Sequence, residues 1–141
     1  MVLALNIKQK EEDMNWFIIA AGIVGGMTTI GHFLVGSKQF LSPMLESQFD
    51  QVPKKVMHSV FHYVSVYLVL STAALLLAGF GVDLGGDTTV LVRFIAANYV
   101  AFALWQIIIA STSGIPNGVF KLFQWVFFVI IAACSFLGTL S

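Results

Sequence analysis

Residues 14–37 read MNWFIIAAGIVGGMTTIGHFLVGS, a run of 24 residues without Asp, Glu, Lys or Arg. A bilayer core about 30 Å thick is crossed by roughly 20 apolar residues in a helix, so this run is long enough to span it. Three more uncharged runs meet the same length: Val56–Val82, Phe94–Phe120 and Leu122–Ser141. With an apolar fraction of 58% and a mean hydropathy of +0.91, they predict an all-α integral membrane protein. We expect an antiparallel four-helix bundle that forms a single domain over residues 1–141.

The longest connection, residues 38–55, alternates apolar and polar side chains and contains Ser42-Pro43. Because Pro is favoured at the start of a helix, we expect a short amphipathic helix within Ser42–Gln51 that lies in the membrane interface and ends at Pro53. Residues 1–13 are expected to form an exposed or interfacial tail. The expected helices run from about Trp16 to Val35, from Lys55 to Ala78, from Thr88 or Thr89 to Ile109, and from the turn at residues 111–118 to Leu137.

The charges indicate which partners to expect. A net charge of zero leaves no basic patch for nucleic acid, so the lipid bilayer is the first partner, with a homo-oligomer or a larger membrane complex as further ones. The membrane face that receives residues 38–55 is called the loop face, and the opposite one the tail face. The loop face receives Lys38, Lys54, Lys55 and Lys121, and the tail face receives Lys8, Lys10 and Arg93. The positive-inside rule then favours a cytoplasmic loop face with both termini outside.

Three histidines are expected at one level of the membrane, just below the loop face. His32 lies one turn before the expected end of the first span, and His58 and His62 lie in the first turns of the second. Spacing i, i+4 places His58 and His62 on one helix face. The first span also carries small residues at spacings of three or four, which let membrane helices approach closely. This stripe, which we expect to face the second helix, consists of Gly22, Gly25, Thr29, His32 and Gly36.

Neutral imidazoles are ligands for Zn, Cu and Fe, so the three histidines predict a metal site in which Glu46 or water supplies a fourth ligand. Alternatively, His32 and His62 hold a haem iron axially. Polar residues expected at the same level support such a site: Thr29, Ser65, Gln106, Gln124 and Lys121. In a purely structural interpretation, the histidines are hydrogen-bond partners of Ser, Thr, Tyr63 or carbonyl groups. A third interpretation is proton handling, because histidine is the side chain type that titrates near neutral pH.

Function therefore stays open among several classes at this stage. A metal-binding or haem-binding protein is the first hypothesis, a structural or accessory subunit is the second, and a small oligomeric channel or transporter is the third. The spans contain no Asp or Glu and no recognisable pair of nucleophile and base, which argues against an enzyme. Nothing in the sequence specifies a substrate.

The first two spans resemble a pattern of small bacterial four-helix membrane proteins. In that pattern a histidine and a Gly close the first span, as in His32-x-x-x-Gly36, and an aromatic-His-x-x-Ser element opens the second. The second element is matched by Phe61-His62-Tyr63-Val64-Ser65, with Pro43 between the two. The resemblance implies a location in the bacterial inner membrane and brings no activity with it. His58 lies outside the pattern.

Overall fold

A computed structural model describes residues 14–141, so the expected tail at residues 1–13 lies outside the described range. Every regular element in that range is a helix, which confirms the all-α class for these residues. In chain order the elements are α2 (Trp16–Gly31), the π-helix η1 (His32–Leu41), α3 (Ser42–Glu46), α4 (Gln51–Gly79), α5 (Thr88–Thr112), α6 (Gly118–Lys121) and α7 (Trp125–Gly138).

Three helical stretches among the described residues are long and apolar enough to cross a membrane. They are Trp16–Glu46, Gln51–Gly79 and Thr88–Thr112, and they indicate an integral membrane protein. α7 is apolar but has only 14 residues. At the helical rise of about 1.5 Å per residue it is about 21 Å long, shorter than a bilayer core.

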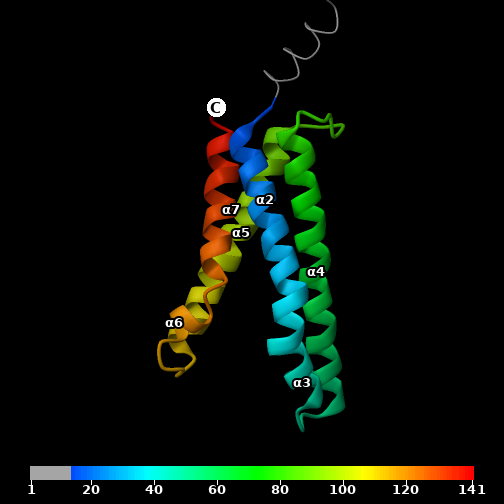
Figure 1. The fold of residues 1–141 in the computed structure, drawn as a ribbon, viewed down its shortest axis with the longest axis vertical. Coiled ribbons are helices and arrows are strands. Elements are labelled where there is room, and N and C mark those ends of the chain that lie inside the picture. Colours follow the sequence, from blue (N-terminus) through cyan, green and yellow to red (C-terminus); the bar gives the residue numbers. More distant parts are fainter. Residues whose placement is uncertain (1–13) are drawn as a thin grey trace, which may run out of the picture.

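The helices form two antiparallel hairpins (Figure 1). In the first hairpin α4 packs along α2 and η1, and in the second α5 packs along α7 and α6. α2 also packs against α7 and so joins the hairpins, whereas α4 and α5, although consecutive in sequence, make few contacts. We call the end that holds Met14 and Ser141 the tail end, and the end that holds α3 and α6 the loop end.

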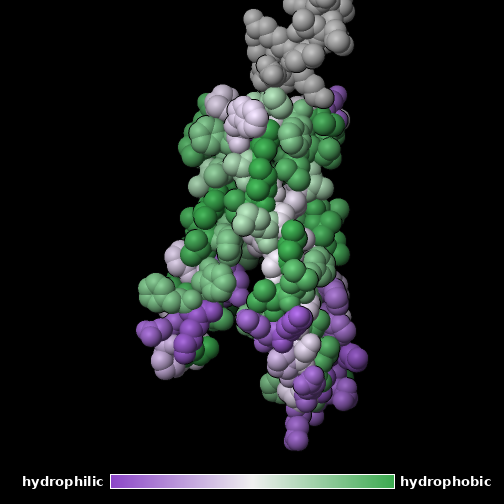
Figure 2. Space-filling view, in the orientation of Figure 1, coloured by the Kyte–Doolittle hydropathy of each residue, from purple (hydrophilic) through white to green (hydrophobic). Residues whose placement is uncertain are grey.

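The two hairpins meet at the tail end and separate toward the loop end. Figure 2 shows an open gap between their lower parts, with hydrophilic residues over both lower ends and a hydrophobic surface above. In this structure the helices therefore form two legs joined at the tail end, so the antiparallel four-helix bundle that the sequence predicted is not confirmed.

Small residues of α2 form the contact with α4, as the sequence predicted. A Cβ atom added to Gly22 would lie 2.7 Å from Leu76 Cδ2, and one added to Gly25 would lie 2.8 Å from Thr72 Oγ1. Thr29 Oγ1 lies 3.3 Å from Thr72 Oγ1, so one hydroxyl donates a hydrogen bond to the other across the helix pair. Because nothing larger than hydrogen fits at Gly22 without a shift, the two backbones approach closely here.

Asn15 links three helix ends at the tail end. Its side-chain oxygen accepts a hydrogen bond from Ile18 N and caps α2, while its own backbone N–H donates to Gly79 O at the end of α4. Its Nδ2 donates to Gly138 O of α7 at 2.6 Å. A Cβ on Gly79 would lie 2.8 Å from the backbone nitrogen of Ile19. The junction is thus held both by hydrogen bonds and by backbone contact.

Aromatic side chains lie where α4 of the first leg meets the second leg. Tyr99 of α5 is fully buried, and its hydroxyl lies 2.8 Å from Ser71 Oγ of α4. Tyr67 of α4 packs against Tyr99 and Phe102, which in turn contact Phe128 of α7. The Tyr67 hydroxyl is buried and has no hydrogen-bond partner among residues 14–141. This cluster forms the apolar contact between the legs on the side of α4 and α5.

The boundaries of the first two spans differ from those expected. The first helix does not end at Gly36, because it continues as η1 and α3 to Glu46. Gly36 is buried, with Phe61 of α4 beside it, and this packing outweighs the low helix propensity of Gly. The short helix expected within Ser42–Gln51 is present as α3, but it follows η1 without a break, and the connection shrinks to residues 47–50. α4 begins at Gln51, with Pro53 in its first turn, where the missing N–H would have no helical partner anyway.

The last apolar segment is interrupted, which the sequence analysis did not predict. Helical geometry stops at Leu122, whose φ of −103° and ψ of 56° are not helical, and resumes at Trp125. The indole Nε1 of Trp125 donates a hydrogen bond to Val119 O, a carbonyl that a continuous helix would use internally. This bond stabilises the interruption, and it accounts for the short length of α7.

Candidate functional site

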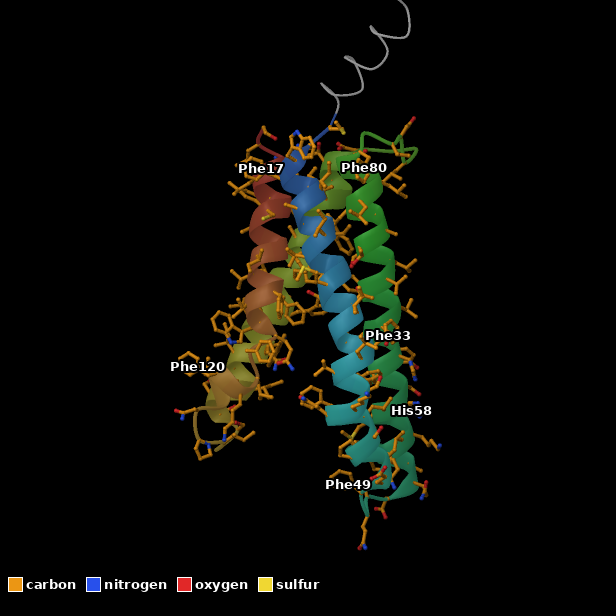
Figure 3. All side chains as sticks on the ribbon, in the orientation of Figure 1. Phe17, Phe33, Phe49, His58, Phe80 and Phe120 are labelled. Atoms are coloured by element: carbon orange, nitrogen blue, oxygen red, sulfur yellow. The ribbon has the colours of Figure 1, made fainter. Side chains whose placement is uncertain are left out.

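The two histidines of α4 lie near the loop end of the first leg. α4 has 29 residues, a length of about 44 Å, whereas the apolar core of a bilayer is about 30 Å thick. With Gly79 at the tail end, the excess of roughly nine residues falls at the N-terminal end of α4. Figure 3 places His58 in this part of the first leg, away from α5 and α7. His58 therefore lies in the part of α4 that exceeds the length of a bilayer core, with His62 one turn further toward Gly79.

The imidazoles of His58 and His62 converge on each other. Their Nε2 atoms are 3.1 Å apart, and their ring centroids are 4.9 Å apart. In the absence of metal, one neutral ring donates its N–H to the lone pair of the other. His62 is exposed and His58 half-buried, so both nitrogens are accessible from outside the helix pair.

The distance between these nitrogens fits two ligands of one metal ion. With metal–nitrogen bonds of about 2.0–2.1 Å, two ligand nitrogens lie about 2.9 Å apart at a right angle and about 3.3 Å apart at a tetrahedral angle. The observed 3.1 Å falls between these values. The distance between the two nitrogens is therefore compatible with two ligands of one metal ion.

His32 has a different environment, because its Nε2 is already bonded to α4. It lies 3.0 Å from Ser65 Oγ and 3.3 Å from Phe61 O, and its ring stacks on Phe61 with a centroid distance of 4.1 Å. Ser65 Oγ donates its own proton to Phe61 O, so it accepts the proton of His32 Nε2. The expected polar support from Ser65 is thus a hydrogen bond that joins the two helices of the first leg. Nε2 of His32 is not free to bind a metal or haem iron here.

The structure brings only part of the predicted site together. Among residues 14–141, no group of three or more His, Cys, Asp and Glu side chains lies close enough to hold one ion. Glu46 is exposed at the end of α3. The set of His32, His58, His62 and Glu46 therefore does not form a single centre in this structure, and only His58 and His62 remain as a pair.

The other predicted polar residues lie in different places. Thr29 belongs to the α2–α4 contact described above, where it is bonded to Thr72. Gln106 of α5 approaches Gln124, with Nε2 and Oε1 3.5 Å apart, beside the interruption before α7. Lys121 is exposed at the end of α6. Gln106, Gln124 and Lys121 thus belong to the second leg, and the gap between the legs separates them from the histidines.

A shallow apolar hollow of about 300 Å³ lies next to His62, which sequence reasoning did not find. Its walls come from η1 and α4, and the lining residues are Phe33, His62, Ser65, Val66, Val69 and Leu70. The sequence signal for it is the row of His58, His62, Val66 and Val69, whose spacing of three and four places them on one side of α4.

Comparison with other proteins finds no protein-family model, no curated protein and no solved structure that matches this chain.

Proposed function

We propose that this chain is a membrane protein that binds a divalent transition-metal ion at its loop face through His58 and His62. The observation that carries the proposal is the 3.1 Å distance between their Nε2 atoms. Histidines at i and i+4 on a regular helix form a rigid chelating pair, because the backbone holds both rings at one distance. Their position near the headgroups gives an ion in the adjacent water a direct path to both nitrogens.

The geometry favours a metal ion over haem. Two axial haem ligands must approach the iron from opposite sides of the porphyrin plane, whereas His58 and His62 lie on one side of a single helix. A haem held by His32 and His62 would require His32 to give up its bonds to Ser65 and Phe61. Zn, Cu and Fe ions all accept neutral imidazole, and the pair by itself does not distinguish among them.

The proposal is tested on the full chain purified in mild detergent. Isothermal titration with Zn²⁺, Cu²⁺ and Fe²⁺, followed by elemental analysis after gel filtration, should show stoichiometric binding of at least one ion. His58→Ala and His62→Ala should each abolish it. Full binding by the double variant His58→Ala, His62→Ala would refute the proposal.

Two control variants separate chelation from other effects. The double change His62→Ala, Tyr63→His keeps the number of histidines but moves the second ring by one residue, or about 100° around the helix. Tyr63 is exposed, so this change should leave the fold intact and still abolish binding. His32→Ala should keep the metal stoichiometry while it lowers stability, because His32 serves the helix contact.

The membrane arrangement is part of the proposal. We place the segment that contains α6 and α7 across the bilayer as a fourth span, with Asn15 and Ser141 on one side. The hydrogen bond from Asn15 Nδ2 to Ser141 Oγ supports this placement. The excess of Lys at the loop face favours that face in the cytoplasm of a bacterial inner membrane. Labelling of single cysteines at exposed positions 48 and 141 with a membrane-impermeant reagent tests the orientation, since only position 141 should react in intact cells.

A second candidate function, as a subunit of a larger membrane assembly, is favoured by the gap between the legs. Two hairpins that contact each other mainly near the tail end leave apolar helix surfaces unpaired toward the loop end (Figure 2). Native mass measurement of the protein extracted in mild detergent tests this candidate, which predicts co-purification of another membrane protein in fixed ratio.

A further inference from the structure

The metal pair of His58 and His62 supplies two ligands, and Zn²⁺ in proteins usually takes four. We propose that a second copy of this chain supplies the other two through its own His58 and His62, so that one ion joins two chains. The inference rests on the proposed metal binding and adds to it the partner and the coordination.

The position of the pair allows a second copy to reach the same ion. His62 is exposed on the side of α4, where Val66 and Val69 continue its row deeper into the membrane. Val66 is 57% exposed and Val69 is 46% exposed, so no other helix among residues 14–141 covers these two positions. Beyond His62 the row consists of valines, and the hollow of about 300 Å³, lined also by Phe33 and Leu70, lies beside it. A helix of a second copy that packs into this hollow brings its own histidine pair toward the same ion.

Membrane insertion itself brings the two pairs to one level. Copies of one chain insert with the same orientation, so a twofold axis along the membrane normal relates them. That axis leaves every residue at its own depth. The two histidine pairs therefore face each other at the same height when the two α4 rows pack together. Four imidazoles at one level form the nitrogen-only ligand set that Zn²⁺ and Cu²⁺ accept.

The dimer is also limited to two chains. An interface that uses the same row on both copies is self-complementary and closes on itself. One ion per two chains is thus the expected stoichiometry. Metal should shift the equilibrium from monomer to dimer, because only the dimer offers four ligands to one ion.

The test uses the full chain in detergent micelles, titrated with ZnCl₂. Zinc content after gel filtration and native mass should show one ion per two chains and a doubled protein mass. X-ray absorption should show four nitrogen ligands around zinc. His62→Ala should abolish both the zinc and the dimer.

A crosslinking experiment locates the interface independently of metal content. In a chain with its own Cys134 changed to Ser, Val69→Cys should form an intermolecular disulfide several-fold faster with zinc than without it. Val60→Cys is the matched control, because Val60 is 49% exposed but lies nine residues away, on the opposite side of α4. Its crosslinking should not respond to zinc.

The outcomes distinguish this inference from the proposed function. One zinc ion per chain at monomer mass, with two nitrogen and two oxygen ligands, would overturn the shared site and leave metal binding by the pair intact. Water or a lipid phosphate would then complete the coordination. No binding of Zn²⁺, Cu²⁺ or Fe²⁺ would overturn both the shared site and the proposed function.

Discussion

Replacement of Gly22 by Ala should separate α2 from α4. The added Cβ would lie 2.7 Å from Leu76 Cδ2, 2.8 Å from Leu76 Cγ and 3.1 Å from Leu76 N. The Leu76 side chain can rotate away from the first two contacts, but its backbone nitrogen moves only if the helix moves. The substitution therefore cannot be absorbed by one side chain.

The expected magnitude is a difference between two effects. Extra volume in a closely packed contact costs about 1–3 kcal/mol. Ala in place of Gly stabilises a helix by up to about 1 kcal/mol, which offsets part of that cost. With the propensity gain included, the free energy of unfolding should therefore fall by about 0–2 kcal/mol for Gly22→Ala, which is about 1–3 kcal/mol below a variant that has the gain alone.

The matched control is Gly31→Ala in the same helix. A Cβ at Gly31 would meet no atom within 4 Å, so only the propensity gain applies and stability should stay equal or rise. The assay is reversible unfolding in mixed micelles of mild detergent and sodium dodecyl sulfate, followed by circular dichroism. Equal stability of the two variants would refute the close approach of α2 and α4, since that approach requires Gly22→Ala to be less stable than Gly31→Ala.

Further variants test single hydrogen bonds by the same assay. Tyr99→Phe should lower the free energy of unfolding by about 1 kcal/mol because it removes the bond to Ser71, whereas Tyr67→Phe should leave it equal or raise it, because the Tyr67 hydroxyl has no partner. Equal losses in both variants would contradict this assignment. Asn15→Ala should cost about 1–2 kcal/mol through the lost cap and the lost bond to α7, and no loss would show that the tail-end junction is not formed. His32→Phe should lower stability by about 1 kcal/mol, as it loses the bond to Ser65 but keeps the stacked ring.

The features that sequence reasoning found depend on local patterns. Uncharged runs located the long helices because the requirement for apolar length is simple. The spacing of Gly22, Gly25 and Thr29 located the α2–α4 contact, because small side chains recur on one helix face. The i, i+4 spacing of His58 and His62 also predicted that both rings share one helix face, and in the structure the two rings converge on each other.

The features that it missed depend on contacts between helices. Gly36 was expected to end the first helix, but Phe61 of α4 packs beside it and the helix continues. The interruption at Leu122 is stabilised by Trp125 through a carbonyl acceptor that no sequence pattern marks. From its expected depth in the membrane, His32 was predicted to lie beside the other histidines. Depth alone does not reveal that the Nε2 of His32 is hydrogen-bonded to Ser65 and Phe61.

The Asn15 junction constrains the order in which the chain reaches its final shape. Gly138, whose carbonyl accepts the Asn15 side-chain amide, follows it by 123 positions. During synthesis α2 enters the membrane long before α7 exists. The side-chain amide of Asn15 therefore cannot donate to Gly138 until nearly the whole described chain has left the ribosome. The first hairpin can pair early through its glycine contact with α4, but the tail end closes last. Until then each of the two hairpins can contact other membrane helices. This period ends when the final turn of α7 binds Asn15.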